Sequence, residues 1–284
     1  MRILRSVSGT LTDITHQVTD YYNHSPNINL TATDYLYIGQ RMPFNNIYFK
    51  VGTVNTNSVG VDKIAIWDGS AFRDCVNVVD ETITSAASKV FAGSGHMSWT
   101  PNKQYLWSID DTQTLSGSEK ITGLGGVAIY DHYWVRIKLD GTLTTGTSLS
   151  WVGSLFSNDN DLSTEFPDLL KTKTLTSFLA GKTNWEEQHV RAAKLIIEDL
   201  LRMNFINHPG QILVKESLTN ASVSKVAELI YQSFGPDYIE LKNEVRKEYE
   251  TRLEKGVFQK DLDKDGILDP EEAIQFFEAK VYRR

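Results

Sequence analysis

The spacing of apolar residues changes near Leu162, and this change constrains the fold more than any other feature of the sequence. Before it, apolar and polar residues alternate in short runs, whereas beyond it apolar residues recur every three or four positions. Charge follows the same boundary, because the first 162 residues hold 11 Lys and Arg and 15 Asp and Glu, against 18 and 21 in the last 122. Strands have a period of two and helices one near 3.6. The chain is therefore expected to contain two parts with different secondary structure.

Alternating runs separated by turn residues fill most of the first part. The clearest runs are residues 44–51 (FNNIYFKV), 61–67 (VDKIAIW) and 126–138 (GVAIYDHYWVRIK). Asp68-Gly69 is typical of a two-residue hairpin turn in which both central residues have positive φ. Five of the six Trp lie here, and aromatic residues favour strands. We predict about eight strands between Tyr35 and Val152, forming a jelly-roll-like β-sandwich over residues 33–160.

We predict an irregular segment at the N-terminal end of the chain and helices at the C-terminal end. Residues 1–32 are too polar to assign to strands, and we expect an N-terminal arm or irregular segment that orders against a neighbour. Thr183 and Glu186 fit a capping box ahead of an apolar stripe that includes His189. Further helices are expected over residues 167–180, 216–234, 237–255 and 270–281. The predicted fold thus has two domains, an all-β sandwich followed by an all-α helical bundle over residues 161–284.

One motif carries specific chemistry. Residues 261–272 read DLDKDGILDPEE, which places acidic side chains at loop positions 1, 3, 5, 9 and 12 and Gly266 at position 6. This is the pattern of an EF-hand calcium loop, in which hard oxygen ligands surround the ion and glycine permits the sharp turn. The expected ligands are Asp261, Asp263, Asp265, the Ile267 carbonyl, Asp269 directly or through water, and bidentate Glu272.

The sequence contains one such loop, and this bears on its role. Sensor proteins pair two such loops and expose an apolar groove on binding. Gly256 also interrupts the helix that would enter the loop. We therefore expect a structural Ca²⁺ that fixes the C-terminal helix to the bundle. The alternative is a solvated acidic turn followed by a capped helix.

Composition excludes several classes of protein. The net charge of −7 disfavours broad binding to nucleic-acid phosphates, and the single cysteine, Cys75, excludes internal disulfides and multi-cysteine metal sites. No run of eighteen apolar residues is present and the N-terminus lacks a secretory apolar region, so we expect no membrane association. The six histidines lack metal-binding spacing, and His189 is expected to be a hydrogen-bonded core residue. We find no catalytic pattern and predict that the protein is not an enzyme.

The helical part resembles virion proteins of tailed bacteriophages, in particular head-to-tail connector proteins. The segments that carry this resemblance are NWEEQHVRAAKLIIEDLLRMN, AELIYQSFG and DLDKDGILDPEE. The segments PFNNIYFKV, IAIWDGSAF, GHMSWTP and YWVRIKL look like sandwich domains of phage neck, tail and baseplate proteins. The resemblance implies a neck or adaptor protein of the virion, made in the host cytoplasm. It would form a ring with copies of itself, contact portal and tail or neck proteins, and project the sandwich outward.

Two other interpretations stay open. The chain fits a tail, collar or baseplate adaptor that anchors fibres, since a sandwich domain is not part of the minimal connector. It also fits a calcium-stabilised carbohydrate-binding module, which would need an exposed row of aromatic side chains on the sandwich. Proximity to DNA is left open, and no specific nucleic-acid binding is expected.

Overall fold

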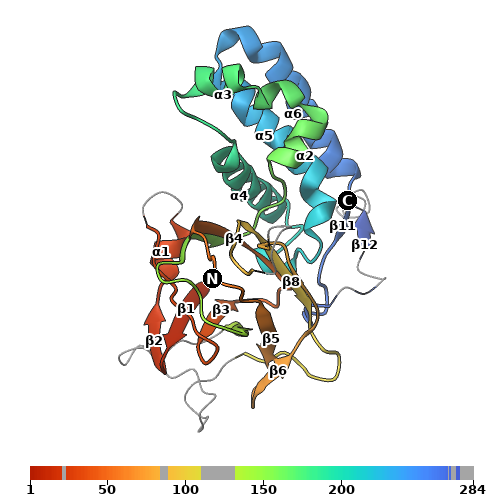
Figure 1. The fold of residues 1–284 in the computed structure, drawn as a ribbon. Helices are drawn as coiled ribbons and strands as arrows, with labels where there is room; N and C mark the ends of the chain where they lie inside the picture. Colours follow the sequence, from red (N-terminus) through yellow and green to blue (C-terminus); the bar gives the residue numbers. More distant parts are fainter. Residues whose placement is uncertain (21–23, 84–88, 110–131, 268, 270–272, 276–284) are drawn as a thin grey trace. The chain divides into compact units, whose positions relative to one another are not determined.

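The computed structural model describes residues 1–20, 24–83, 89–109, 132–267, 269 and 273–275 (Figure 1). Contacts between Cα atoms divide the chain into two compact units. The first comprises Met1–Gly153 together with Asp263–Ile267, and the second comprises Ser154–Leu262 and Leu268–Arg284.

The first unit contains two antiparallel sheets. The six-stranded sheet has the order β2-β1-β3-β9-β5-β6, with β1 at Arg2–Val7, β2 at Thr10–Asp13, β3 at Tyr35–Gln40, β5 at Val61–Trp67, β6 at Phe72–Asp74 and β9 at Tyr133–Leu139. The four-stranded sheet has the order β10-β4-β8-β7, with β4 at Asn46–Thr53, β7 at Val76–Asp80, β8 at Gly95–Thr100 and β10 at Ser148–Gly153. Of the strands described, eight lie between Tyr35 and Gly153, as the alternating runs predicted.

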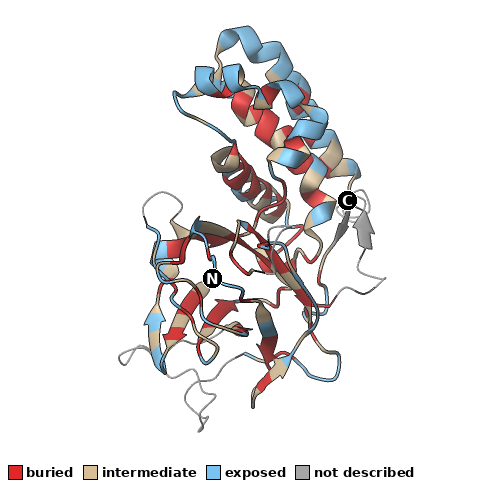
Figure 2. Ribbon diagram, in the orientation of Figure 1, coloured by how far each residue is buried: buried red, intermediate tan, exposed pale blue. Residues whose placement is uncertain are grey.

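Both sheets contribute to one core. In β9, Val135, Ile137 and Leu139 are buried in this core, while Arg136 and Lys138 alternate with them and face the other side of the sheet. Ile47 and Phe49 of β4 enter the same core from the four-stranded sheet. Figure 2 shows the buried residues along these strands. A second apolar cluster lies on the outer face of the six-stranded sheet and comprises Leu4, Tyr37, Ala65, Trp67, Phe72 and Trp134.

The N-terminal segment is part of this fold, in contrast to the arm expected over residues 1–32. It forms β1, β2 and the short helix α1 (Thr15–Thr19). Ile3 and Leu4 are fully buried, one on each face of the sheet. The polar residues on either side of them have partners elsewhere in the unit, because Arg2 pairs with Asp13 at 2.5 Å and the Ser8 amide donates to Asp34 at 2.7 Å. These partners explain why a polar composition is compatible with a strand.

The turn after β5 also differs from the prediction. Residues 68–71 connect β5 to β6, and of the two central residues expected to have positive φ only Gly69 has it, at 93°. Asp68 instead closes the turn with its carboxylate, which accepts hydrogen bonds from the Ser70 and Ala71 amides, each at 2.7 Å. A four-residue loop held by an aspartate therefore replaces the two-residue turn.

The second unit contains most of the helices. They are α2 (Asp159–Glu165), η1 (Pro167–Leu170), α3 (Thr172–Phe178), α4 (Glu186–Arg202), η2 (Pro209–Gln211), η3 (Lys215–Leu218), α5 (Thr219–Ser233), η4 (Pro236–Tyr238) and α6 (Ile239–Lys255). Buried residues run through α4 and α5, whereas α6 buries Val245, Tyr249 and Leu253 (Figure 2). Gly235 ends the α5 region with a φ of 91°, in the left-handed region that glycine favours.

The helix starts are not all where the capping signals placed them. α4 begins at Glu186, but Trp185 occupies its N-cap and no side-chain cap hydrogen bond is made there. The capping box of this unit is at α2, where the Asn158 side chain accepts from the Asn160 and Asp161 amides and Asp161 accepts from the Asn158 amide. Trp185 is fully buried and donates its indole N–H to the Leu169 carbonyl at 2.8 Å. Burial of this ring therefore fixes the start of α4.

The expectation of an all-β domain followed by an all-α domain is wrong. Helix α1 lies in the first unit, and β11 (Val257–Gln259) and β12 (Ala273–Gln275) form a two-stranded sheet in the second. Residues Asp263–Ile267 group with the first unit although they follow the helices in sequence. Hydrophobic period predicts local structure, whereas these features depend on contacts between segments that are distant in the chain.

Candidate metal centre

The acidic loop connects two strands and not two helices. Helix α6 ends at Lys255, and β11 pairs antiparallel with β12, with Gln259 opposite Ala273. Residues 273–275 were expected in a helix over residues 270–281, and this prediction is wrong for them; the rest of that range lies outside the described residues. Val257 and Phe258 are residue types that favour strands, and the ladder brings the two ends of the loop together.

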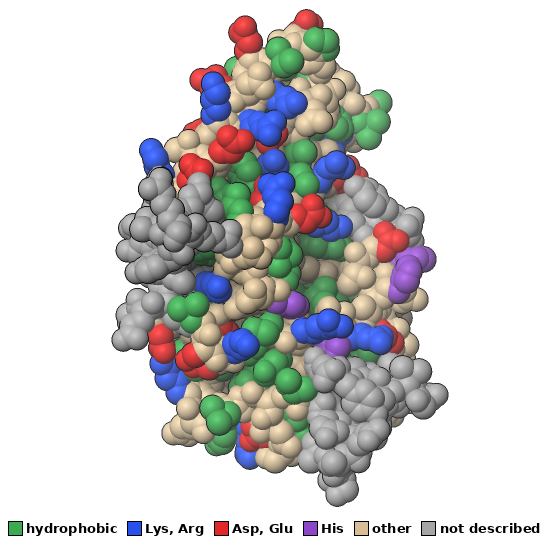
Figure 3. Space-filling view, turned by 180° about the vertical axis from the view of Figure 1, so that it is seen from behind, with side chains coloured by type: hydrophobic (Ala, Val, Ile, Leu, Met, Phe, Trp, Pro, Cys, Tyr) green, Lys and Arg blue, Asp and Glu red, His purple; other side chains and the backbone are tan. Residues whose placement is uncertain are grey.

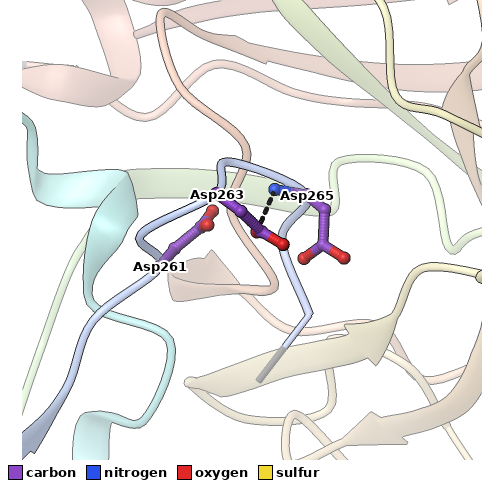
Figure 4. Close-up of side chains that lie close together, drawn as sticks. All are labelled: Asp261, Asp263 and Asp265. Atoms are coloured by element: carbon purple, nitrogen blue, oxygen red, sulfur yellow. Dashed lines mark hydrogen bonds between the residues drawn. The ribbon is translucent and has the colours of Figure 1, made fainter. Parts of the chain in front are cut away.

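Three of the predicted ligands lie close together. Asp261, Asp263 and Asp265 each offer a carboxylate oxygen, and these oxygens all lie within 4.8 Å of one another (Figure 4). Asp261 is fully buried, while Asp263 is exposed and Asp265 is half-buried. Carboxylates that approach this closely repel one another unless a cation or a proton compensates them. The cluster is therefore a candidate cation site of hard oxygen ligands.

The backbone of the loop brings these side chains to one side. Asp263 Oδ1 accepts the Asp265 amide at 3.2 Å, and Asp265 Oδ1 accepts the Ile267 amide at 2.7 Å. Lys264 and Gly266 have φ angles of 68° and 74°, so the chain turns sharply at both. A Cβ at Gly266 would lie 3.1 Å from the Trp107 ring, which leaves little room for a side chain.

Asp261 is anchored through its main chain. Its amide donates to the Gln211 carbonyl at 3.0 Å, and its carbonyl accepts from the Gln211 side-chain amide at 3.0 Å. Gln211 is itself buried, and its side-chain oxygen accepts the Asn207 amide at 2.7 Å. The position of the Asp261 backbone is therefore set independently of its carboxylate.

The other three predicted ligands have different outcomes. Ile267 is buried and follows the turn, so its carbonyl stays a predicted ligand. Asp269 is half-buried and does not join the three-aspartate cluster found among the described residues. A ligand at this loop position commonly binds through water. Glu272 lies outside the described residues. Of the six predicted ligands, the structure thus brings the carboxylates of Asp261, Asp263 and Asp265 together.

A second polar constellation is buried between helices. Ser157 Oγ lies 2.8 Å from His189 Nδ1 and 2.6 Å from Ser222 Oγ, and His189 Nε2 lies 3.2 Å from Asp159 Oδ1. These residue types occur in hydrolytic triads. Here Ser157 is 4% exposed and His189 1% exposed, so neither is open to a substrate. The arrangement satisfies buried polar groups that join the start of α2 to α4 and α5.

Sequence reasoning placed His189 in the core but missed its partners. Ser157 and Asp159 lie 32 and 30 residues before it. Only the position of a histidine on an apolar stripe signals that some polar partner is needed. The identity of that partner depends on tertiary packing.

Burial raises the pKa of a thiol in the first unit and of a phenol in the second. Burial, with a contribution from Asp74, raises the pKa of the Cys75 thiol to about 12, so it is protonated at neutral pH and a poor nucleophile. Burial likewise raises the pKa of Tyr249, and the hydrogen bond that Tyr249 Oη donates to Asp199 at 2.7 Å raises it further. Both residues are accounted for by packing.

Comparison with known proteins adds no assignment. No family model, curated protein or solved structure matches the chain. Among the residues described, no helix combines the length and the apolar composition that crossing a bilayer requires. Functional conclusions therefore depend on the residues and contacts of the chain itself.

Proposed function

We propose that the protein is a non-catalytic structural component of a tailed bacteriophage particle, a head-to-tail connector or neck protein that assembles with copies of itself. The observation that carries this proposal is an exposed apolar edge strand, β7. The resemblance of the helical segments to connector proteins is the reason for proposing a phage particle and a position at its neck. The ring, the portal and the tail or neck partners are parts of the same proposal.

Strand β7 has an edge suited to pairing with another chain. Among the strands that the structure describes, it is the last of the four-stranded sheet and pairs with β8 on one side. Val76, Val78 and Val79 expose 46%, 38% and 51% of their surface. Edge strands that stay monomeric usually carry lysine, proline, inward charges or a β-bulge. The sequence VNVVD has no lysine or proline, and its register with β8 shifts between Val76 and Val79, where Asn77 has a φ of 51°. An exposed edge with apolar side chains therefore supports subunit contact.

The helical unit also exposes apolar side chains. Leu179, Ile239 and Leu241 expose 60%, 55% and 44% of their surface. Apolar side chains also reach the surface between charged ones on the face in Figure 3. Each unit thus offers apolar surface of the kind that a multi-subunit particle buries.

Calcium binding at residues 261–272 is the second part of the proposal. The loop brings three carboxylates together, and the β11-β12 ladder joins its ends. With Asp261, Asp263 and Asp265 as the nucleus, the Ile267 carbonyl, Asp269 and Glu272 would complete the six to eight oxygen ligands that Ca²⁺ takes. In place of fixing a C-terminal helix, the ion would hold the loop between the two strands.

Assembly is tested by mass photometry across protein concentrations with the variant Val79→Asp. The matched control is Val54→Asp, because Val54 exposes 46% of its surface and follows β4 of the same sheet. We expect wild type and Val54→Asp to form the same closed oligomer, and Val79→Asp to dissociate at a concentration at least tenfold higher. A wild-type monomer at all concentrations would contradict assembly. Antibody labelling at the collar or baseplate of the particle would contradict the neck position.

A further inference from the structure

A pocket on the outer face of the six-stranded sheet joins cationic and aromatic side chains. Its volume is 520 Å³, within the range that small-ligand pockets occupy. It is lined by Tyr35, Lys63, Phe72, Arg73, Asp74, Asn102, Tyr105, Arg136 and Lys138. These residues come from β3, β5, β6 and β9 and from the segment after β8, all within the first unit.

The charge of this wall is opposite to that of the whole chain. Four lining residues are cationic and one, Asp74, is anionic, whereas the chain has a net charge of −7. Lys63 and Lys138 are directly opposite each other in the register of β5 and β9. The excess of cationic over anionic side chains in the lining favours an anionic ligand.

Ion pairs around the pocket hold the cations in place. Lys63 Nζ lies 2.6 Å from Asp74, Lys138 Nζ lies 2.7 Å from Asp62, and Arg73 Nε lies 2.5 Å from Asp68. Asp62 and Asp68 do not line the pocket, so they orient their partners without placing a carboxylate in its wall. The cations are thus positioned before a ligand arrives.

Arg136 is positioned by aromatic rings. Its guanidinium carbon lies 4.7 Å from the centre of the Tyr35 ring and 4.4 Å from that of Phe72. Stacking fixes the plane of a guanidinium group, whose N–H fork matches a carboxylate or phosphate in two parallel hydrogen bonds. The rings of Tyr35 and Phe72 are therefore engaged with Arg136, and the pocket is not the open aromatic row that neutral sugars need.

The remaining lining residues suit a hydroxylated ring. The Asn102 amide and the Asp74 carboxylate offer donors and acceptors for hydroxyl groups. Tyr105 is 36% exposed, and Arg73 lies over its ring at 4.7 Å from the centre. A free inorganic anion would use only the cations, whereas an acidic sugar would use the cations, the amide and the ring edge.

We propose that this pocket binds an acidic sugar, with the sugar carboxylate held by Arg136 and flanking lysines and the ring hydroxyls facing Asn102 and Asp74. The ligand class is a uronic acid or a glycan that carries one. This inference goes beyond the assembly role and the calcium loop, because it involves other residues and a different face of the first unit.

The test is a titration of the full chain, followed by NMR or calorimetry, with methyl glucuronide, methyl glucoside and inorganic phosphate as separate probes. We expect saturable binding of the glucuronide and at least tenfold weaker binding of the glucoside and of phosphate. Added NaCl should weaken glucuronide binding, because exposed ionic contacts are screened. Glucoside binding as tight as glucuronide binding would overturn recognition of the carboxylate. Phosphate binding as tight as glucuronide binding would overturn recognition of the sugar ring. No binding of any probe would overturn the site.

Variants locate the site. Arg136→Gln should lower glucuronide affinity at least tenfold, since a charge-assisted pair of hydrogen bonds is lost. Lys138→Gln is the second variant, because the Lys138 side chain is about a third exposed and its loss leaves the core unchanged. Arg41→Gln is the control, an exposed arginine of the same unit outside the pocket. Unchanged affinity in both pocket variants would overturn the proposal, whatever the outcome of the assembly experiment.

Discussion

Removal of the Asp261 carboxylate is the sharpest test of the calcium loop. The variant Asp261→Asn keeps the size of the side chain and both main-chain hydrogen bonds to Gln211. It removes one charged ligand from a cluster whose oxygens lie within 4.8 Å of one another. In the absence of metal, each pair of carboxylates at this separation repels by roughly 1 to 3 kcal/mol, depending on the local dielectric. The variant should therefore be at least as stable as wild type in chelator.

Calcium should reverse this order. For a loop of this class with a Kd of about 10 μM, 1 mM Ca²⁺ stabilises the folded state by about 2.7 kcal/mol. For a unit of this size, that energy raises Tm by about 5 to 10 °C. A tenfold loss of affinity in Asp261→Asn would remove about 1.4 kcal/mol of this gain, roughly half of the shift.

The assay is thermal unfolding followed by circular dichroism, in 1 mM EDTA and in 1 mM CaCl₂ at constant ionic strength. Asp237→Asn is the control, since Asp237 is an exposed acid at the start of η4 and lies away from the loop in sequence. The control should keep the full calcium shift. A wild-type Tm that is the same in both buffers, or a full shift in Asp261→Asn, would refute the metal site.

Two further predictions concern the six-stranded sheet. Gly39→Ala should destabilise the protein by about 1 to 3 kcal/mol in urea titrations, because its Cβ would lie 2.8 Å from the buried Trp134 ring. Gly60→Ala is the control and should destabilise less, because its Cβ would meet only the flexible Asp140 carboxylate, at 3.2 Å. Equal losses of stability in the two variants would contradict this packing. Burial raises the pKa of Asp68, but hydrogen bonds from Arg73 and the turn outweigh it and hold that pKa below its ordinary value near 4. The stability contributed by Asp68 is therefore present above pH 4 and is lost as pH falls below it, so Asp68→Asn should lose less stability than wild type between pH 5 and 3. An identical pH profile would contradict this role.

The local sequence pattern predicts an element when its signals lie within a few residues of it, or when one of its faces is apolar and the other is polar. In β9, valine, isoleucine and leucine alternate with arginine and lysine, and the strand confirms the second half of the run predicted over residues 126–138. Residues 126–131 of that run lie outside the described residues. Gly235 and Pro236 mark the end of α5 within two residues, because a left-handed residue and a missing amide both stop a helix. These signals act within a few residues of the element they define.

Features that depend on distant partners were not predictable in this way. β1 pairs with β3, and its burial on both faces could not be inferred from RILRSV, in which arginine and serine separate the apolar residues. β12 pairs with β11 across the acidic loop, and the sequence after Pro270 indicated a helix. In each case a ladder hydrogen-bond partner, which sequence period does not identify, decided the secondary structure.

The candidate metal centre shows the same division. The motif predicted the ligand types and the turn at Gly266 from spacing alone, because coordination by a short loop is a local problem. It also implied a helix after the loop, over residues 270–281, and only a short or broken helix before it because of Gly256. Here Gly256 ends α6 before the loop, and the strands that follow align Gln259 with Ala273. The β11-β12 ladder therefore holds the two ends of the loop near each other, as a pair of flanking helices would.

Strand alternation separates the proposed activities of the first unit. On β9, Val135 and Ile137 belong to the core, whereas Arg136 and Lys138 line the pocket on the opposite face. Substitutions at the pocket can therefore change ligand recognition without altering the core between the sheets. β7 lies in the other sheet, so an edge contact there involves none of the pocket strands. Loss of assembly in Val79→Asp with glucuronide binding retained, and the converse in Arg136→Gln, would show that the two surfaces act independently.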